Sequence, residues 1–141
     1  MWPIIGVLSV PSTSGPCETL TATSCFDAVY VKWIESAGGR VAPIPYDSDD
    51  ADLDSLFSSV NGMLFTGGET DLSGSTDESA QYMHATQRLF NQSVEHKTPL
   101  WGTCMGFQVL NVLVGGINVL ETNVYDSEGL SLPLNLTEEA H

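Results

Sequence analysis

Cys104 is the residue of this sequence best placed to do chemistry, because glycines flank it in the segment WGTCMGFQ (101–108). A cysteine that only fills a core does not need glycines on both sides, whereas one that projects from a tight turn does. Residues 99–103 have the pattern of a strand and residues 105–114 that of a helix. The order strand, G-x-C-x-G, helix is that of a nucleophile elbow, with cysteine in place of serine.

Such a turn would activate the sulfur and stabilise a reaction intermediate. The helix that follows directs its amide groups and its positive dipole end at Cys104, which favours the thiolate. The amide of Met105 then lies where a tetrahedral intermediate carries its oxyanion, and the TGG segment (66–68) offers the amide of Gly68 as a second donor. The competing interpretation is that Cys104 is a buried, small apolar side chain, as most lone cysteines are.

The rest of the chain alternates between apolar runs of strand length and segments of helical periodicity. We expect strands at 3–10, 40–45, 62–65, 99–103 and from 117, and helices from 25 to 37 and at about 50–58, 77–96 and 105–114. Short βαβ units of this kind predict an α/β fold, a parallel sheet with helices on both faces. Ligands bind such sheets beyond the carboxyl ends of the strands, where the Gly67–Gly68 loop and the turn at Cys104 belong.

The sequence also predicts how the helices are capped and which faces they bury. Ser24 and Asp50 are the expected N-caps of the first two helices, and Gly38–Gly39 should end the first. We expect the core to contain one stripe of each longer helix, together with Trp101; the stripes are Phe26, Val29, Tyr30, Trp33, Ile34 and Ala37, and Ala80, Met83, Phe90 and Val94.

The composition argues against several classes of partner. The chain of 141 residues has 18 acidic and 4 basic side chains and a net charge of −14, so neither nucleic acid nor an anionic membrane is an expected partner. Its start, MWPIIGVLSV, lacks the charged lead of a signal peptide, and we interpret it as a strand. The aspartates of 47–54 lack the spacing of a calcium loop, so we expect a solvated helix start, with no metal and no cofactor.

The remaining reactive residue types have ordinary interpretations. Three cysteines are too few for a disulfide framework. Neither Cys17 nor Cys25 separates the candidate functions, and we expect a structural or bystander role for Cys17. His84 is expected on a helix surface. His96 is expected at the carboxyl end of the same helix, where the negative end of the helix dipole stabilises an imidazolium. Two N-x-S/T sequons, at Asn91 and Asn135, hint at a secretory route.

Four segments together resemble the gamma-glutamyl hydrolase family of cysteine peptidases: YVKWIESAGGRVAPIP, GMLFTGGETDL, WGTCMGFQ and LPLNLT. They occur in the family's order, and the resemblance covers nearly the whole chain. It implies the class I glutamine amidotransferase-like (flavodoxin-like) fold, with residues 1–141 as the amino-terminal part of a single domain. It also implies hydrolysis of gamma-glutamyl bonds, above all in folate polyglutamates, through a thioester on Cys104.

The resemblance implies roles for further residues. Gly68 and Met105 match the family's oxyanion donors. Gly67, Gln108 and His141 match positions at which the family binds its substrate. Gln108 stands where the family has Glu and related amidotransferases have Gln. The family's base, a histidine with an acidic partner, lies downstream of the PLN segment and outside this chain. We therefore expect weak or no turnover by residues 1–141 alone.

Two other functions stay open: a glutaminase-type amidotransferase domain, and a non-catalytic truncated relative. The expected partner is a small molecule, a folyl or antifolate poly-gamma-glutamate, and a homodimer is possible. The parent protein is expected in a lysosome, in a vacuole or outside the cell, since an acidic compartment would weaken the repulsion between an anionic tail and this acidic chain. An uncovered sheet edge and apolar face predict self-association.

Overall fold

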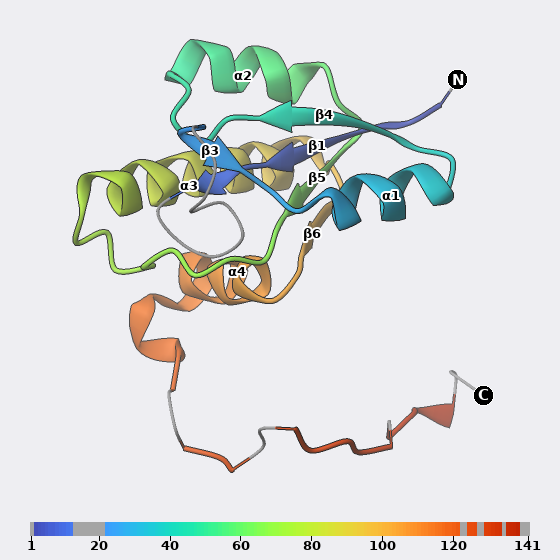
Figure 1. The fold of residues 1–141 in the computed structure, drawn as a ribbon, viewed down its shortest axis with the longest axis vertical. Helices are drawn as coiled ribbons and strands as arrows, with labels where there is room; N and C mark the ends of the chain where they lie inside the picture. The colour runs from blue at the N-terminus through green and yellow to red at the C-terminus, as the bar shows by residue number, and fades with distance from the viewer. Residues whose placement is uncertain (1, 13–21, 122–123, 127–128, 134, 139–141) are drawn as a thin grey trace.

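The computed structural model describes residues 2–12, 22–121, 124–126, 129–133 and 135–138. Within these residues the centre of the molecule is a parallel four-stranded sheet in the order β4-β1-β5-β6 (Figure 1). Its strands are β1 (Ile4–Leu8), β4 (Arg40–Ile44), β5 (Gly62–Phe65) and β6 (Leu100–Gly102). A small antiparallel ladder pairs β2 (Val10–Pro11) with β3 (Ser24–Cys25). All four predicted strands before residue 104 are confirmed.

Helices cover both faces of this sheet, as predicted. They are α1 (Ala28–Ser36), α2 (Asp50–Ser58), α3 (Asp77–His96) and α4 (Met105–Gly115). The larger core lies between the sheet and α2, α3 and α4, and it includes Leu8, Ile44, Leu53, Phe57, Phe65, Tyr82, Leu89, Met105 and Val109. On the other face α1 packs Ile34 against Val7 of β1 and Leu64 of β5.

The strand expected from residue 117 is instead a short 3-10 helix, η2 (Ile117–Val119). Gly116 turns the chain after α4 with φ +80°, and the amide of Val119 then donates to the Gly116 carbonyl at 3.2 Å. A short apolar run does not by itself distinguish a strand from a turn of helix, which is why periodicity gave the wrong answer here.

The first two helices begin at different caps from those predicted. Asp27, not Ser24, caps α1, and its carboxylate accepts the Val29 amide at 2.9 Å. Ser24 lies in β3, where it pairs with Pro11. Asp49 caps α2, one residue before the predicted Asp50, and accepts the Asp52 amide at 2.8 Å. Tertiary pairing of the β2–β3 ladder thus overrides the local capping pattern.

The end of α1 confirms its predicted glycine stop. Gly38 adopts φ +85°, which only glycine reaches without strain, and its amide donates to the Glu35 carbonyl at 2.9 Å. The amide of Gly39 donates to the Ile34 carbonyl at 3.0 Å. These two bonds form a Schellman motif, which turns the chain directly into β4.

The buried face of α3 differs from the predicted stripe. The helix buries Ser79, Tyr82, Ala85, Thr86, Leu89 and Ser93, whereas Ala80 and Val94 are exposed. The buried stripe contains small hydroxyl side chains that form hydrogen bonds with backbone carbonyls of the same helix. The Thr86 hydroxyl donates to the Met83 carbonyl at 2.9 Å, and the Ser93 hydroxyl donates to the Leu89 carbonyl at 2.7 Å. Polar residues that bury in this way are invisible to a hydropathy pattern.

Ion pairs join α3 to the aspartates of α2. Arg88 donates to Asp54 at 2.6 and 2.7 Å and to Asp50 at 2.9 Å, and the His84 ring lies 2.7 Å from Asp50. The hydrogen bond from Arg88 holds the pKa of the Asp54 carboxyl below its usual range. The acidic stretch therefore serves helix packing, and the described residues contain no cluster of three His, Cys, Asp or Glu that could hold a metal ion.

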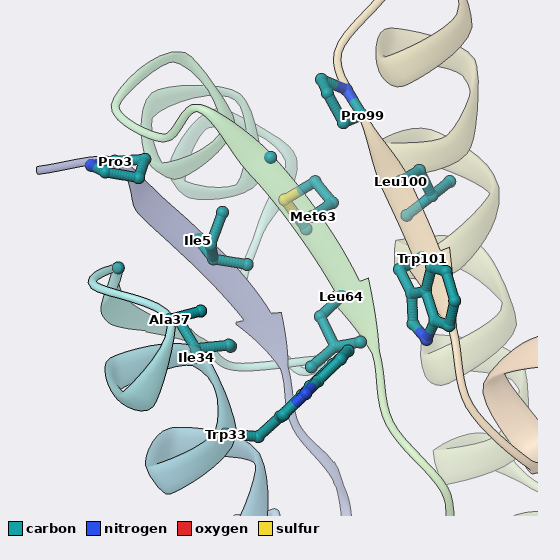
Figure 2. A pocket seen from close by; sticks show the side chains of 12 residues that line it. Pro3, Ile5, Trp33, Ile34, Ala37, Met63, Leu64, Pro99, Leu100 and Trp101 are labelled. Carbon is teal, nitrogen blue, oxygen red and sulfur yellow. The ribbon is translucent and has the colours of Figure 1, made fainter.

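Two tryptophans expected in the core lie on an uncovered part of the sheet. Trp33 of α1 is 51% exposed and Trp101 of β6 is 60% exposed. Their ring centroids lie 6.1 Å apart, and the two side chains flank Leu64 of β5 (Figure 2). They line a cavity of about 380 Å³ that also includes Pro3, Ile5, Ile34 and Leu100. The prediction was wrong because α1 packs beside β4, and within the described residues it leaves the side chain of Trp101 on β6 largely exposed.

The corrected face of α3 can be tested by a pair of truncations. Leu89→Ala should destabilise the chain by about 3 kcal/mol, because Leu89 is fully buried and its loss leaves a cavity. Val94→Ala on the same helix should change stability by less than about 0.5 kcal/mol, because that side chain is 63% exposed. Urea denaturation monitored by circular dichroism measures both, and equal losses would contradict the observed face.

Candidate active site

Cys104 occupies a strained turn between β6 and α4, as the sequence predicts. It is the N-cap of α4, with φ 52° and ψ −115°. A positive φ is uncommon for any residue with a β-carbon, and such strain is concentrated at functional sites. The side chain is exposed, and among the described cysteines it is the free one. These features exclude the interpretation of Cys104 as a buried core residue.

The two glycines around Cys104 are required by close packing. A β-carbon on Gly106 would lie 2.1 Å from the Phe65 carbonyl oxygen, and one on Gly102 would lie 2.6 Å from the backbone of Gly106. The contacts are with backbone atoms, which cannot move aside as a flexible side chain would. The first turn of α4 therefore packs directly on the end of β5, and only glycine fits at these positions.

The Gly67–Gly68 loop passes beside Cys104 at the carboxyl edge of the sheet. The Thr103 amide donates to the Phe65 carbonyl at 3.1 Å and so joins the ends of β5 and β6. A β-carbon on Gly67 would lie 3.3 Å from the β-carbon of Cys104, and one on Gly68 would lie 3.0 Å from the terminal methyl of Met105. The structure thus brings the predicted residues Gly67, Gly68, Cys104 and Met105 together.

Two backbone amides at this edge are unpaired among the described residues. Met105 is the first residue of α4, so its amide has no partner inside the helix. Neither this amide nor that of Gly68 has a hydrogen-bond acceptor within the part of the chain that the structure describes. Two donors of this kind next to a nucleophile are what an oxyanion hole requires, and their catalytic role stays a prediction.

The Gly67 amide, in contrast, is already occupied. It donates to the hydroxyl oxygen of Tyr30 at 2.8 Å. The sequence placed Tyr30 in the core and gave it no role at this site. Its ring is half-buried and packs against the cluster of Val7, Ile34 and Leu64, as a core residue would, and no feature of the pattern indicates that its hydroxyl reaches the loop.

The far end of the same loop is held by a network around Asp71. Its carboxylate accepts hydrogen bonds from the Ser73 hydroxyl at 2.6 Å, the Ser75 hydroxyl at 2.5 Å and the Ser73 amide at 2.9 Å. These bonds, led by the one from Ser73, hold the pKa of the Asp71 carboxyl well below its usual range. The Ser79 hydroxyl donates to the Asp71 carbonyl at 2.5 Å and ties the loop to α3.

The other predicted site residues lie apart or outside the described chain. Gln108 is exposed in the first turn of α4, where its backbone N–H donates to the Cys104 carbonyl at 3.1 Å. His141 falls outside the described residues. His84 is engaged with α2 through Asp50, and the His96 ring lies 5.9 Å from that of Phe57. No described histidine is hydrogen-bonded to Cys104.

The structure describes one of the two remaining cysteines and both sequon asparagines. Cys25 is disulfide-bonded, which fits a structural role although three cysteines predicted no disulfide framework. Cys17 lies outside the described residues. Asn91, in the middle of α3, and Asn135 are both exposed, and glycosylation at these sites stays a prediction.

Comparison with known proteins decides the family. The model of the Peptidase C26 family matches residues 3–131. The chain belongs to the Peptidase C26 family. It is 43% identical over 118 residues to gamma-glutamyl hydrolase of Mus musculus, covering 80% of this chain and 35% of that protein. It is 38% identical over 115 residues to gamma-glutamyl hydrolase of Homo sapiens, covering 78% of this chain and 34% of that protein.

Other matches extend this family assignment. Gamma-glutamyl hydrolase of Bos taurus is 36% identical over 140 residues, which is 96% of this C26 chain and 42% of that protein. The chain thus spans well under half the length of these relatives. A putative peptidase E protein from Listeria monocytogenes EGD-e has a TM-score of 0.53 at 14% identity, covering 87% of this chain and 59% of that chain. This likeness supports the predicted flavodoxin-like fold.

The close packing at the elbow makes Gly106 a sensitive position. Gly106→Ala should destabilise the chain by about 3 kcal/mol, because the new methyl group must displace the Phe65 carbonyl. The control is Val114→Ala on the same helix, where the side chain is 76% exposed and the change should stay below about 0.5 kcal/mol. Urea denaturation measures both, and an unperturbed Gly106→Ala variant would show that α4 does not pack as described.

The Asp71 network predicts a pH dependence. Because the pKa of Asp71 is lowered in the folded state, its contribution is complete above about pH 4 and is lost as the pH falls further. Asp71→Asn should therefore lower the melting temperature at pH 7, and the difference from wild type should shrink towards about pH 2. Glu69→Gln in the same loop is the charge-matched control, and a pH-independent difference for Asp71→Asn would refute the interpretation.

Proposed function

We propose that this chain supplies the nucleophile and the oxyanion hole for hydrolysis of gamma-glutamyl bonds. The observation that carries the proposal is the free, exposed thiol of Cys104 on a positive-φ turn, beside the unpaired amides of Gly68 and Met105 within the described residues. The family assignment supports it, since the relatives named above are gamma-glutamyl hydrolases. The chain spans only 35% of the mouse protein, so the activity of a whole parent protein belongs to this proposal.

The proposed chemistry is acyl transfer through a thioester. The Cys104 sulfur attacks the γ-carbonyl carbon, and the electron pair of the carbonyl bond moves to its oxygen, which the amides of Gly68 and Met105 stabilise. Collapse of this intermediate breaks the carbon–nitrogen bond and expels the amine, which takes up a proton. Water then cleaves the thioester, returning the thiol and a γ-carboxylate. The proton transfers need a base, which the resemblance assigns to a downstream histidine.

The proposed substrate is a folyl poly-gamma-glutamate, and the proposed location is a lysosome, a vacuole or the extracellular space. The disulfide at Cys25 supports such a location, because disulfides persist in oxidising compartments. The exposed sequon asparagines Asn91 and Asn135 are compatible with the same route. An acidic compartment would also protonate part of the 18 carboxylates and so reduce repulsion of an anionic substrate.

Acylation of residues 1–141 by the γ-p-nitrophenyl ester of N-acetylglutamate tests the proposal. Its p-nitrophenolate leaving group needs no proton, so the step does not depend on a general acid or base. We expect folded protein to acylate at Cys104 at least about 100-fold faster than urea-unfolded protein, because only the folded chain has the oxyanion hole. Intact-mass spectrometry should show one acyl group, absent in Cys104→Ser.

The corresponding α-ester and glutamine separate the alternatives. Equal acylation by the α-ester would remove the support for γ-specificity, and ammonia release from glutamine would favour a glutaminase. If folded and unfolded chains react at the same rate, Cys104 is an ordinary thiol, and the non-catalytic interpretation replaces the proposal.

A further inference from the structure

The hydroxyl of Tyr30 lies next to the nucleophile although its ring belongs to the core. The ring is anchored in the cluster of Val7, Ile34 and Leu64 under α1. Its oxygen accepts the Gly67 amide at 2.8 Å. The position of a β-carbon on Gly67 would be 3.0 Å from this oxygen and 3.3 Å from the β-carbon of Cys104. Tyr30 and Cys104 therefore both lie close to the same glycine.

Gly67 and Gly68 need an external restraint to hold one conformation. Two consecutive glycines have the widest choice of backbone angles of any pair, so the peptide between them can rotate at little cost. On the downstream side the loop is fixed, because the Thr70 amide donates to the Met105 sulfur at 3.2 Å and Asp71 holds its own network. On the upstream side the tether at Gly67 is the hydroxyl of Tyr30.

We propose that Tyr30 is a positioning residue of the active site: its hydroxyl fixes the Gly67 peptide so that the Gly68 amide faces the oxyanion. This inference rests on the proposed function, because it assigns the Gly68 amide to the intermediate. Tyr30 also occupies the Gly67 amide, which leaves Gly68 and Met105 as the pair of donors. The half-buried ring packs against the cluster under α1, so the tether links the position of α1 to that of the Gly67 peptide.

The test compares two reactions of Cys104 that differ in their need for an oxyanion hole. Alkylation by iodoacetamide displaces iodide and creates no oxyanion. Reversible addition to the γ-aldehyde of N-acetylglutamate forms a sulfur–carbon bond, and the thiol proton passes to the former carbonyl oxygen, which sits in the hole. Tyr30→Phe keeps the ring but removes the tether. We expect the aldehyde Kd to rise about tenfold, with an alkylation rate within about twofold of wild type.

Tyr82→Phe is the matched control. Tyr82 is fully buried, and its hydroxyl has no hydrogen-bond partner among the described residues, so its removal should leave both reactions unchanged. A role of Tyr30 in stability alone would change the alkylation rate together with the aldehyde Kd and would lower the melting temperature. That outcome, or an unchanged aldehyde Kd in Tyr30→Phe, would overturn the inference.

Failure of the proposed function gives a different result. If wild-type protein binds the aldehyde no more tightly than Cys104→Ser does, the nucleophile and its oxyanion hole are not assembled, and the proposed function falls together with this inference. If wild type binds tightly through Cys104 and Tyr30→Phe binds equally tightly, the proposed function stands and only the role of Tyr30 is refuted.

Discussion

The contact between the first turn of α4 and the last residue of β5 determines the geometry of the whole site. Because Gly106 lies against the Phe65 carbonyl, α4 begins almost on top of the neighbouring strand end. The chain must then turn sharply after Gly102, and Cys104 takes the positive φ that this turn demands. The strain of that conformation is offset by packing of Met105, Val109 and Val112 into the larger core. A looser elbow would not hold the Cys104 thiol at the surface.

The loop that faces the elbow is held independently at its two ends. Core packing of Tyr30 anchors Gly67, and hydrogen bonds of Asp71 and Ser79 anchor the segment that leads into α3. The restraints come from opposite faces of the sheet, since α1 covers one face and α3 the other. The Gly68 amide has no hydrogen-bond partner among the described residues. Its position is therefore set by the tertiary contacts of the loop and not by the local sequence.

This division explains which parts of the site the sequence could predict. The elbow is local: strand, glycine, cysteine, glycine and helix follow one another between residues 99 and 115, so the pattern alone indicates Cys104 and Met105. The contribution of Tyr30 spans 37 residues of chain and depends on how α1 lies on the sheet, which periodicity does not report. The buried face of α3 was wrong for a related reason, because Thr86 and Ser93 are polar by type but satisfied on the backbone.

The exposure of the two tryptophans was also missed because helical spacing does not report how a helix lies on the sheet. Trp33 has helical spacing with Tyr30 and Ile34, which indicates a core position, yet α1 packs beside β4 and both tryptophans stay exposed. The cavity between Trp33 and Trp101 is lined by apolar side chains and does not include Cys104, so it is separate from the chemistry. The groups to which we assign acylation lie instead in the loop after β5 and in the turn from β6 into α4. In the proposed mechanism a general base adds proton transfer to this geometry without having to create it, so acylation can be measured separately from turnover.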